Sequence, residues 1–371
     1  MTSPILHPGV GAIPGEHYLP SRPEEVLWGW LPNLSTKPAM TVESGSTVTI
    51  DTVSHEGLLE DQGRSPVAYL EQFGVTDVLR DVIDIAASDL HQGAEDGPHI
   101  VTGPIHVTSA APGDVLRVEI LDLVPRVPYG FVSSRHGYGA LVGEFPEDAD
   151  SLATREVDTL VSMGTVSHFS WVEELDGSRI GRIAAGSGRT VQFPINPFLG
   201  LMGVARATEE LVNSVPPGDH GGNIDIKHAV AGTTLYLPVQ TDGAMFYAGD
   251  PHFAQGNGEV ALTALEASLR ATVRLSVLSG SDARAAIGVL TTPVVETATH
   301  WIPTGMDESL DIAMKNAVRN AIDFLNTRLG VPRSVALAYL SAAGDFEVSQ
   351  VVDAVKGVHC MIRKADFAAW V

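Results

Sequence analysis

Cysteine is the scarcest residue with chemical potential in this chain, because Cys360 is the only one among 371 residues. One cysteine excludes an internal disulfide and a thiolate metal cluster, and it is compatible with a reducing compartment. Cys360 lies in the apolar segment 358–362. In that setting a cysteine more often fills a core than acts as a nucleophile.

Basic side chains are also scarce. The chain has 23 Lys and Arg against 45 Asp and Glu, which gives a formal net charge of −22. Such a surface repels the phosphates of nucleic acids and anionic membranes, so we expect neither as a partner. A neutral small molecule is not excluded by this charge.

Long apolar runs are missing as well. No segment approaches the roughly 20 residues that a membrane span requires. The first 20 residues lack the basic start and continuous apolar core of a signal peptide. We therefore expect a soluble, cytoplasmic protein. Aromatic residues make up 6%, whereas 37 Gly and 23 Pro predict many turns between short strands.

The familiar hydrolase motifs are absent. The chain has no G-x-S-x-G nucleophile elbow, no H-E-x-x-H metalloprotease motif and no glycine-rich phosphate loop that ends in Gly-Lys-Ser/Thr. Catalysis by one of the usual serine or cysteine arrangements is therefore not predicted.

The order of apolar patterns predicts strands first and helices late. Strand patterns cover residues 40–52, 100–124, 157–183, 233–239, 260–278 and 346–355. Helical spacing covers 307–329, with Asp307 as the expected cap and Gly330 as the end, and a shorter helix covers 332–341. Residues 75–87 form a short helix or an irregular segment, and residues 194–203 are too rich in Pro and Gly for regular structure.

This order predicts an α+β fold that is predominantly β, with antiparallel sheets and a few late helices. No linker or low-complexity stretch marks a boundary. The expectation is one unit over residues 1–371, at most divided into a β-rich N-terminal part (about 1–200) and a site-bearing C-terminal part (about 201–371).

Two polar, glycine-bounded segments stand out. They are residues 219–225 (DHGGNID) and 249–259 (GDPHFAQGNGE), and the apolar strand pattern 233–239 separates them. We expect two such loops to meet at the mouth of a sheet, where functional residues commonly lie. Composition alone also fits ordinary turns, and Asn257-Gly258 could form a hairpin turn.

The chemistry of these segments suits metal-assisted hydrolysis. His and Asp are ligands that Zn²⁺ accepts in sites with an open water position. Asp250 and His252 alternate along an extended segment, so both can reach one ion. A nearby Glu can take a proton from water and pass it to a leaving amine. Asn or Gln amides can stabilise the developing oxyanion.

Three other polar segments carry weaker signals. Residues 54–63, which include His55 and Glu56, either line a pocket or form a solvated loop. His99 precedes a strand pattern, and the Arg135-His136 loop could gate a site. Their roles stay open on sequence alone.

At these residues the chain resembles the acetamidase/formamidase family. The similarity rests on blocks that follow in order along the chain: residues 102–120, 201–205, 216–225, 249–259 and 348–359. It implies β-rich sandwich-like and barrel-like parts, a homo-oligomer (dimer or higher), a divalent metal at the site, and hydrolysis of formamide, acetamide or related short amides. Residues 54–63 and 126–139 depart from the family pattern, so the particular amide stays open.

The resulting hypothesis is an amidohydrolase that cleaves a short-chain amide to carboxylate and ammonia. In it, a metal, expected to be zinc, is held by His220, Asp225, Asp250 and His252. Glu259 is the general base, and Asn223 and Gln255 orient the substrate amide. Two alternatives remain: a hydrolase of a lactam or another non-peptide C–N substrate, and a non-catalytic β-rich binding protein.

Overall fold

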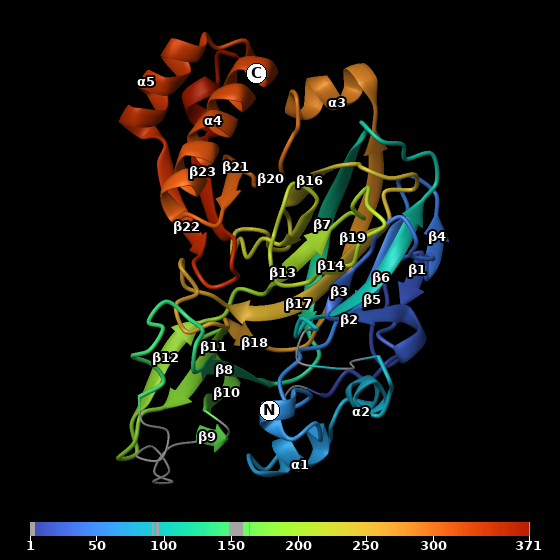
Figure 1. Ribbon diagram of the computed structural model, residues 1–371, viewed down its shortest axis with the longest axis vertical. Helices are drawn as coiled ribbons and strands as arrows, with labels where there is room; N and C mark the ends of the chain where they lie inside the picture. Colours follow the sequence, from blue (N-terminus) through green and yellow to red (C-terminus); the bar gives the residue numbers. More distant parts are fainter. Residues whose placement is uncertain (1–3, 91–92, 94–95, 148–158, 163, 371) are drawn as a thin grey trace.

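The structure is a computed structural model that describes residues 4–90, 93, 96–147, 159–162 and 164–370. Its described elements are mostly strands, gathered into two large sheets (Figure 1). Almost all strand pairs are antiparallel, and the exceptions are β1 with β5 and β4 with β6. The prediction of a predominantly β, antiparallel α+β fold is confirmed.

The first sheet has nine strands in the order β1-β5-β19-β7-β16-β20-β21-β23-β22. Their bounds, in chain order, are β1 His17–Leu19, β5 Thr47–Asp51, β7 Val115–Pro125, β16 Thr234–Pro238, β19 Leu269–Leu278, β20 Val294–Glu296, β21 His300–Asp307, β22 Asp345–Gln350 and β23 Lys356–Arg363.

The second sheet has twelve strands, and its main path runs β12-β11-β10-β8-β18-β17-β13-β15. β6 pairs with β17, β2 and β4, and β9 pairs with β10. The bounds are β2 Val26–Trp28, β4 Met40–Val42, β6 Ile100–Val107, β8 Tyr129–Arg135, β9 Thr159–Ser162, β10 Thr165–Leu175, β11 Ser178–Ala184, β12 Thr190–Pro194, β13 Phe198–Gly203, β15 Gly221–Asn223, β17 Phe246–Ala254 and β18 Leu265–Glu266. A separate pair joins β3 (Trp30–Leu31) to β14 (Val212–Asn213).

The described helices lie at the two ends of the molecule (Figure 1). At one end are α1 (Pro66–Glu71) and α2 (Arg80–Ala86), and at the other are α3 (Gly280–Ile287), α4 (Leu310–Leu329) and α5 (Arg333–Ala343). Short 3₁₀ turns occur at Pro23–Glu25, Glu60–Gln62 and Lys364–Phe367. No helix within the described ranges is long and apolar enough to cross a membrane.

Helix α4 forms because its small and apolar side chains recur at helical spacing. Ala313, Ala317, Ala321 and Leu325 are fully buried, which places one face of α4 against β21 and β23. The predicted cap was two residues early, since Asp307 ends β21 and Ser309 occupies the N-cap. Gly330 ends the helix in a left-handed conformation, as predicted.

Two predicted loops are strands in the structure. Residues 198–203 form β13, and residues 249–254 belong to β17, so the prediction of irregular structure at these positions was wrong. Both strands are buried almost throughout. Their glycines are needed for close approach of neighbouring groups: a Cβ on Gly203 would lie 2.4 Å from the Tyr247 hydroxyl. Glycine therefore indicated crowding here, not a turn.

Candidate active site

β13 and β17 are antiparallel neighbours, and together they form the floor of the site. Leu199 pairs with Pro251 and Leu201 with Gly249, which sets Gly200 beside Asp250. A Cβ on Gly200 would lie 2.4 Å from Asp225 Oδ1, 2.6 Å from Asp250 Oδ2 and 2.6 Å from His252 Cε1. The missing side chain of Gly200 thus provides the space in which these three groups meet.

His252 is the centre of the group and is completely buried. Its Nε2 lies 3.0 Å from Asp250 Oδ2 and 3.0 Å from Glu266 Oε1. On the other side of the ring, Nδ1 lies 3.9 Å from Asp225 Oδ1. One imidazole is therefore surrounded by three carboxylates.

Two neighbouring sets of ligand-type atoms meet at this ring. One atom each from Asp225, His252 and Glu259 lie within 4.8 Å of one another, and the same holds for His55, Asp250 and Glu266. Asp250 joins the sets, because its Oδ2 lies 3.0 Å from His252 Nε2. Its Oδ1 lies 4.0 Å from His55 Nδ1 and 3.9 Å from His99 Nε2. His99 is oriented by a 3.0 Å hydrogen bond between its Nδ1 and Ser214 Oγ.

The backbone is strained at three of the acids. Asp225, Asp250 and Glu259 have φ values of 48°, 50° and 47°, a region that non-glycine residues seldom adopt. Such conformations persist only where the surrounding structure imposes them, and they concentrate at functional sites.

Burial and mutual repulsion dominate the electrostatics. Burial, reinforced by neighbouring carboxylates, raises the pKa of Asp225, Glu259 and Asp353 well above their usual ranges. It likewise raises the pKa of Glu266 to about 8. For Asp250, burial acts in the same sense, but the nearby imidazoles of His252 and His99 outweigh it and its pKa is lowered.

The imidazoles divide in the same way. Burial lowers the pKa of His55 to about 4, and it also lowers the pKa of His99. For His252, the burial effect is overcome by Asp250 and Glu266, so its pKa lies well above the usual value. The group therefore combines the neutral imidazoles of His55 and His99 with a His252 ring that retains its proton and with carboxylates that lack enough positive charge nearby.

The donor atoms of this group fit a divalent cation. Buried atoms that make no hydrogen bond to the described residues include both carboxylate oxygens of Asp225, Oδ1 of Asp250, Oε2 of Glu266 and Nδ1 of His252. Unpaired buried polar atoms are costly, and imidazole with carboxylate is a ligand set that Zn²⁺ accepts. The residues present thus suit the metal that the sequence led us to expect.

A cavity of about 740 Å³ opens over the group. Near the group its wall includes His55, His99, Asn223, Asp250, Glu259 and Glu266. Arg135, Tyr138 and Val142 line the same cavity. Arg135 is fixed there by Asp61, whose Oδ2 lies 2.7 Å from its Nε, and by Glu56 at 3.5 Å. The predicted Arg135-His136 loop therefore lines the cavity.

The structure brings together four of the seven predicted site residues: Asp225, Asp250, His252 and Glu259. Asn223 lines the cavity, and its Nδ2 donates to the Val215 carbonyl. Gln255 instead donates from Nε2 to the backbone carbonyls of Asp225 and Ser349.

His220, predicted as a metal ligand, is placed apart from this group. Its ring is buried next to Asp219, with 3.7 Å between His220 Nδ1 and Asp219 Oδ1. It is not a member of the ligand sets found among the described residues. The structure thus does not join His220 to Asp225, Asp250 and His252.

Sequence reasoning missed Glu266 and Asp353 and left His55 and His99 without a role. A signal was available for the two acids. Glu266 interrupts a strand pattern at Leu265–Leu269, and Asp353 lies between valines in the segment 351–355. A lone carboxylate inside an apolar run is unusual unless it is paired or functional.

The whole chain is similar to known proteins of one family. The model of the acetamidase/formamidase family matches residues 70–214 and 200–363. A formamidase of Methylophilus methylotrophus is 28% identical over 326 residues, covering 76% of this chain and 78% of that protein. An acetamidase of Mycolicibacterium smegmatis is 27% identical over 310 residues, covering 68% and 73%. The crystal structure of an acetamidase from Bacillus halodurans superposes with a TM-score of 0.70 at 26% identity, covering 95% of this chain and 99% of that one.

Proposed function

Since the chain belongs to the acetamidase/formamidase family, we propose that the cavity over His252 is where it hydrolyses a small amide to carboxylate and ammonia. The chain is a hydrolase that acts on carbon–nitrogen bonds other than peptide bonds. The observation that carries the location is the buried group of carboxylates and imidazoles at the wall of a large cavity.

We assign Asp225, Asp250 and His252 to the binding of a divalent cation, with zinc as the metal that suits them. When bound, the cation supplies a Lewis acid that polarises an amide carbonyl and offsets the repulsion among the carboxylates. His220, which was predicted as the fourth ligand, is not part of this group. His55 lies near Asp250 instead, and Glu266 lies near His252.

Glu259 is assigned the proton transfers. Its side chain lines the cavity and is fully buried, and its pKa is raised. With a cation bound nearby to keep it ionised, a carboxylate with a raised pKa is a stronger base than an exposed one, so it would take a proton from the attacking water and return it to the leaving nitrogen. The products, carboxylate and ammonium, then balance the amide and the water consumed.

Asn223 is assigned the recognition of the amide nitrogen. Because its Nδ2 donates to the Val215 carbonyl, its amide orientation is fixed, and Oδ1 makes no hydrogen bond to the described residues. An unpaired acceptor at the cavity wall suits the N–H groups of a substrate amide. Gln255 acts indirectly, since its hydrogen bond to the Asp225 carbonyl holds the backbone that carries Asp225.

The size of the cavity favours a second candidate, a larger amide or a lactam. Formamide has three heavy atoms and occupies on the order of 60 Å³, about twice the share of one water in the liquid. The cavity measures about 740 Å³, within the range of roughly 300–1,000 Å³ that holds drug-sized ligands. Arg135 and Tyr138 lie where the rest of such a substrate would extend.

A panel assay tests the proposal. Purified protein is given formamide, acetamide, longer primary amides, and five- and six-membered lactams, before and after removal of metal by a chelator. We expect ammonia from primary amides, or ring-opened amino acid from lactams, and at least a tenfold loss on chelation that added zinc reverses.

Each negative result of this assay would contradict a different part of the proposed function. Turnover that is unchanged by the chelator contradicts the role of the cation. No product from any amide or lactam contradicts hydrolysis and leaves the non-catalytic binding protein. In that case Glu259→Gln would leave ligand binding intact, as measured by calorimetry.

The proposal also covers the oligomeric state and the cellular compartment of the protein, and its support is the family resemblance. We propose a homo-oligomer, a dimer or higher, in the cytoplasm. Sedimentation equilibrium of the purified protein tests the assembly, and a monomer at all concentrations contradicts it.

A further inference from the structure

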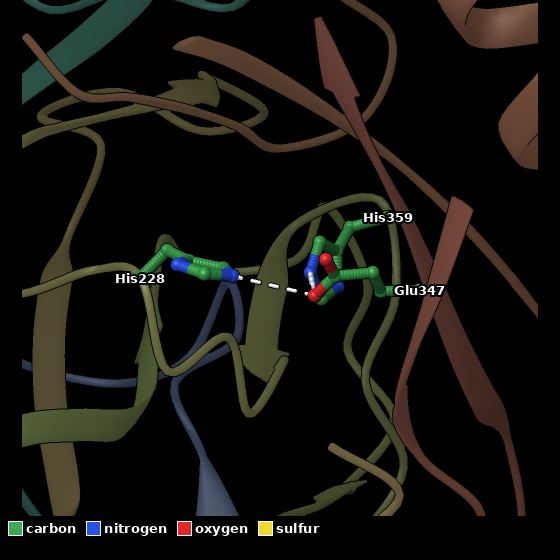
Figure 2. A group of neighbouring side chains, drawn as sticks. All are labelled: His228, Glu347 and His359. Carbon is green, nitrogen blue, oxygen red and sulfur yellow. Dashed lines mark hydrogen bonds and ion pairs between the residues drawn. The ribbon is translucent and has the colours of Figure 1, made fainter. Parts of the chain in front are cut away.

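A second group of ligand-type side chains lies outside the cavity: His228, Glu347 and His359 (Figure 2). We propose that these three residues bind a divalent cation of the zinc class. Glu347 on β22 and His359 on β23 are directly paired in register, and His228 comes from the segment between β15 and β16. None of the three is among the residues that line the large cavity.

The distances fit a cation better than they fit hydrogen bonds. Oε2 of Glu347 lies 3.5 Å from Nε2 of His228 and 3.5 Å from Nε2 of His359, at the long limit for a hydrogen bond. Two ligands of a tetrahedral zinc, each bonded at about 2.0–2.1 Å, are separated by about 3.3–3.4 Å. One atom from each of the three residues lies within 4.8 Å of the others.

His359 is oriented for coordination. Its Nδ1 is 2.8 Å from Ser349 Oγ, and its Nε2 makes no hydrogen bond to the described residues although the side chain is 0% exposed. A hydrogen bond at one ring nitrogen is the usual way to fix the tautomer that presents the other nitrogen to a metal. Figure 2 shows the His228 ring and the His359 ring both near the Glu347 carboxylate, and the two ring centroids are 5.4 Å apart.

The other two residues supply access for an ion. The side chains of His228 and Glu347 are 27% and 31% exposed, so an ion can enter from solvent and keep a water ligand.

The location indicates a structural role. Asn257 Nδ2 donates to Glu347 Oε2 at 2.5 Å, and the backbone N–H of Gly258 donates to the Ser349 carbonyl at 3.0 Å. The group thus contacts the loop that ends at Glu259. A cation here would join the β22–β23 hairpin to the segment that carries His228 and would brace that loop.

Zinc binding, measured without any assay of turnover, tests the inference. The full-length protein is stripped with a chelator, titrated with zinc, and its bound zinc counted after removal of excess metal. We expect His228→Ala and Glu347→Gln each to bind one zinc fewer per chain than the unaltered protein, with at least about 10- to 100-fold weaker affinity at this site. Both positions are partly exposed, so both variants are expected to fold.

Two further variants make the result specific. His17→Ala removes an exposed histidine that is far in sequence from the three proposed ligands, and this variant should bind as much zinc as the unaltered protein. Asp225→Asn alters the His252 group and should keep the zinc that His228→Ala loses. Equal zinc content in the unaltered protein, His228→Ala and Glu347→Gln would overturn the inference and leave a His–Glu–His cluster held by polar contacts alone.

Discussion

Single residues whose backbone or side chain is unusual determine the site. Asp225, Asp250 and Glu259 have left-handed backbones, and Gly200 has no side chain where three others converge. Each feature costs stability when taken alone. Their concentration around His252 indicates selection for the position of functional groups.

Gly200→Ala tests this crowding directly. Its Cβ would lie 2.4–2.6 Å from Asp225, Asp250 and His252, so these side chains must move. A displacement of about 1 Å at a catalytic group costs on the order of 10²-fold, and we expect kcat/KM for the preferred amide to fall at least that much. Gly256→Ala is the matched control, since a Cβ there meets nothing within 4 Å. Equal activity in the two variants would contradict the account of Gly200.

At the scale of elements, sequence patterns predicted the strands and helices that follow a simple period. The strands near residues 100–124 and 233–239 and the helix near 307–329 are present. β13 was missed because its glycines, needed for packing against Asp225 and Tyr247, have the composition of a loop. Short-range patterns do not record which distant groups will press against a strand.

The same limit explains the site. Four predicted residues meet because Asp250 and His252 lie on β17 and because Asp225 and Glu259 follow β15 and β17, and their spacing made them visible. Glu266 and Asp353 reach His252 and Asp225 only through pairing of distant segments. His220 has the right chemistry and the right neighbours in sequence, yet its ring packs beside Asp219. Proximity along the chain did not determine proximity in space.

A buried ion-pair network links elements of the first sheet. Asp51 on β5 accepts hydrogen bonds from Arg270 Nε at 2.6 Å and Nη2 at 3.0 Å, and from the Tyr18 hydroxyl at 2.6 Å. Arg126 Nη2 lies 3.6 Å from the same carboxylate. Asp51 and both arginines are almost completely buried.

Asp51→Asn should therefore be strongly destabilising, because it leaves the buried guanidinium of Arg270 without its counter-charge, whereas Arg126 keeps Asp81 at 2.7 Å. We expect a loss of about 3–5 kcal/mol in the free energy of unfolding, as is usual when one partner of a buried pair is removed. Urea denaturation measures it. Glu25→Gln, which removes the partner of the more exposed Arg22, should cost less than about 1 kcal/mol. Similar losses for both would contradict the role of Asp51.

At the scale of the whole molecule, the site gathers residues from His55 to Asp353 in a chain with a net charge of −22. Most of the acids around His252 have raised pKa values because burial and like charge oppose ionisation. In the metal-free protein, ionisation of these acids would therefore place repelling charges close together around His252. The stability of the metal-free protein should depend on pH for that reason.

We expect the metal-free protein to lose stability as the pH rises from about 6.5 to about 8. Glu266 has a pKa of about 8 in the folded state against 4.5 as the ordinary value, so in this window the folded chain binds more protons than the unfolded chain, and stability falls with pH. His252, with its raised pKa, acts in the same direction. His55, with a pKa of about 4 against 6.5 as the ordinary value, acts in the opposite direction, mainly below this window.

Thermal unfolding in a chelator at pH 6.5 and 8 measures the effect. Added zinc should reduce the fall in melting temperature, because a bound cation compensates the ionised carboxylates. A melting temperature that rises from pH 6.5 to pH 8 in the chelator would contradict the claim that ionisation of the buried acids destabilises the metal-free protein.

The central claim is that amide hydrolysis takes place at the group around His252 with Glu259 as the base, and Glu259→Gln tests it most directly. Turnover of the best amide from the panel is compared in the unaltered protein, in Glu259→Gln and in Glu210→Gln, which changes an exposed glutamate. Circular dichroism and melting temperature verify that each variant is folded. General acid–base catalysis typically contributes 10²–10⁴-fold, so we predict that kcat falls by roughly that factor in Glu259→Gln and is unchanged in Glu210→Gln. A folded Glu259→Gln protein that retains full turnover would contradict the account.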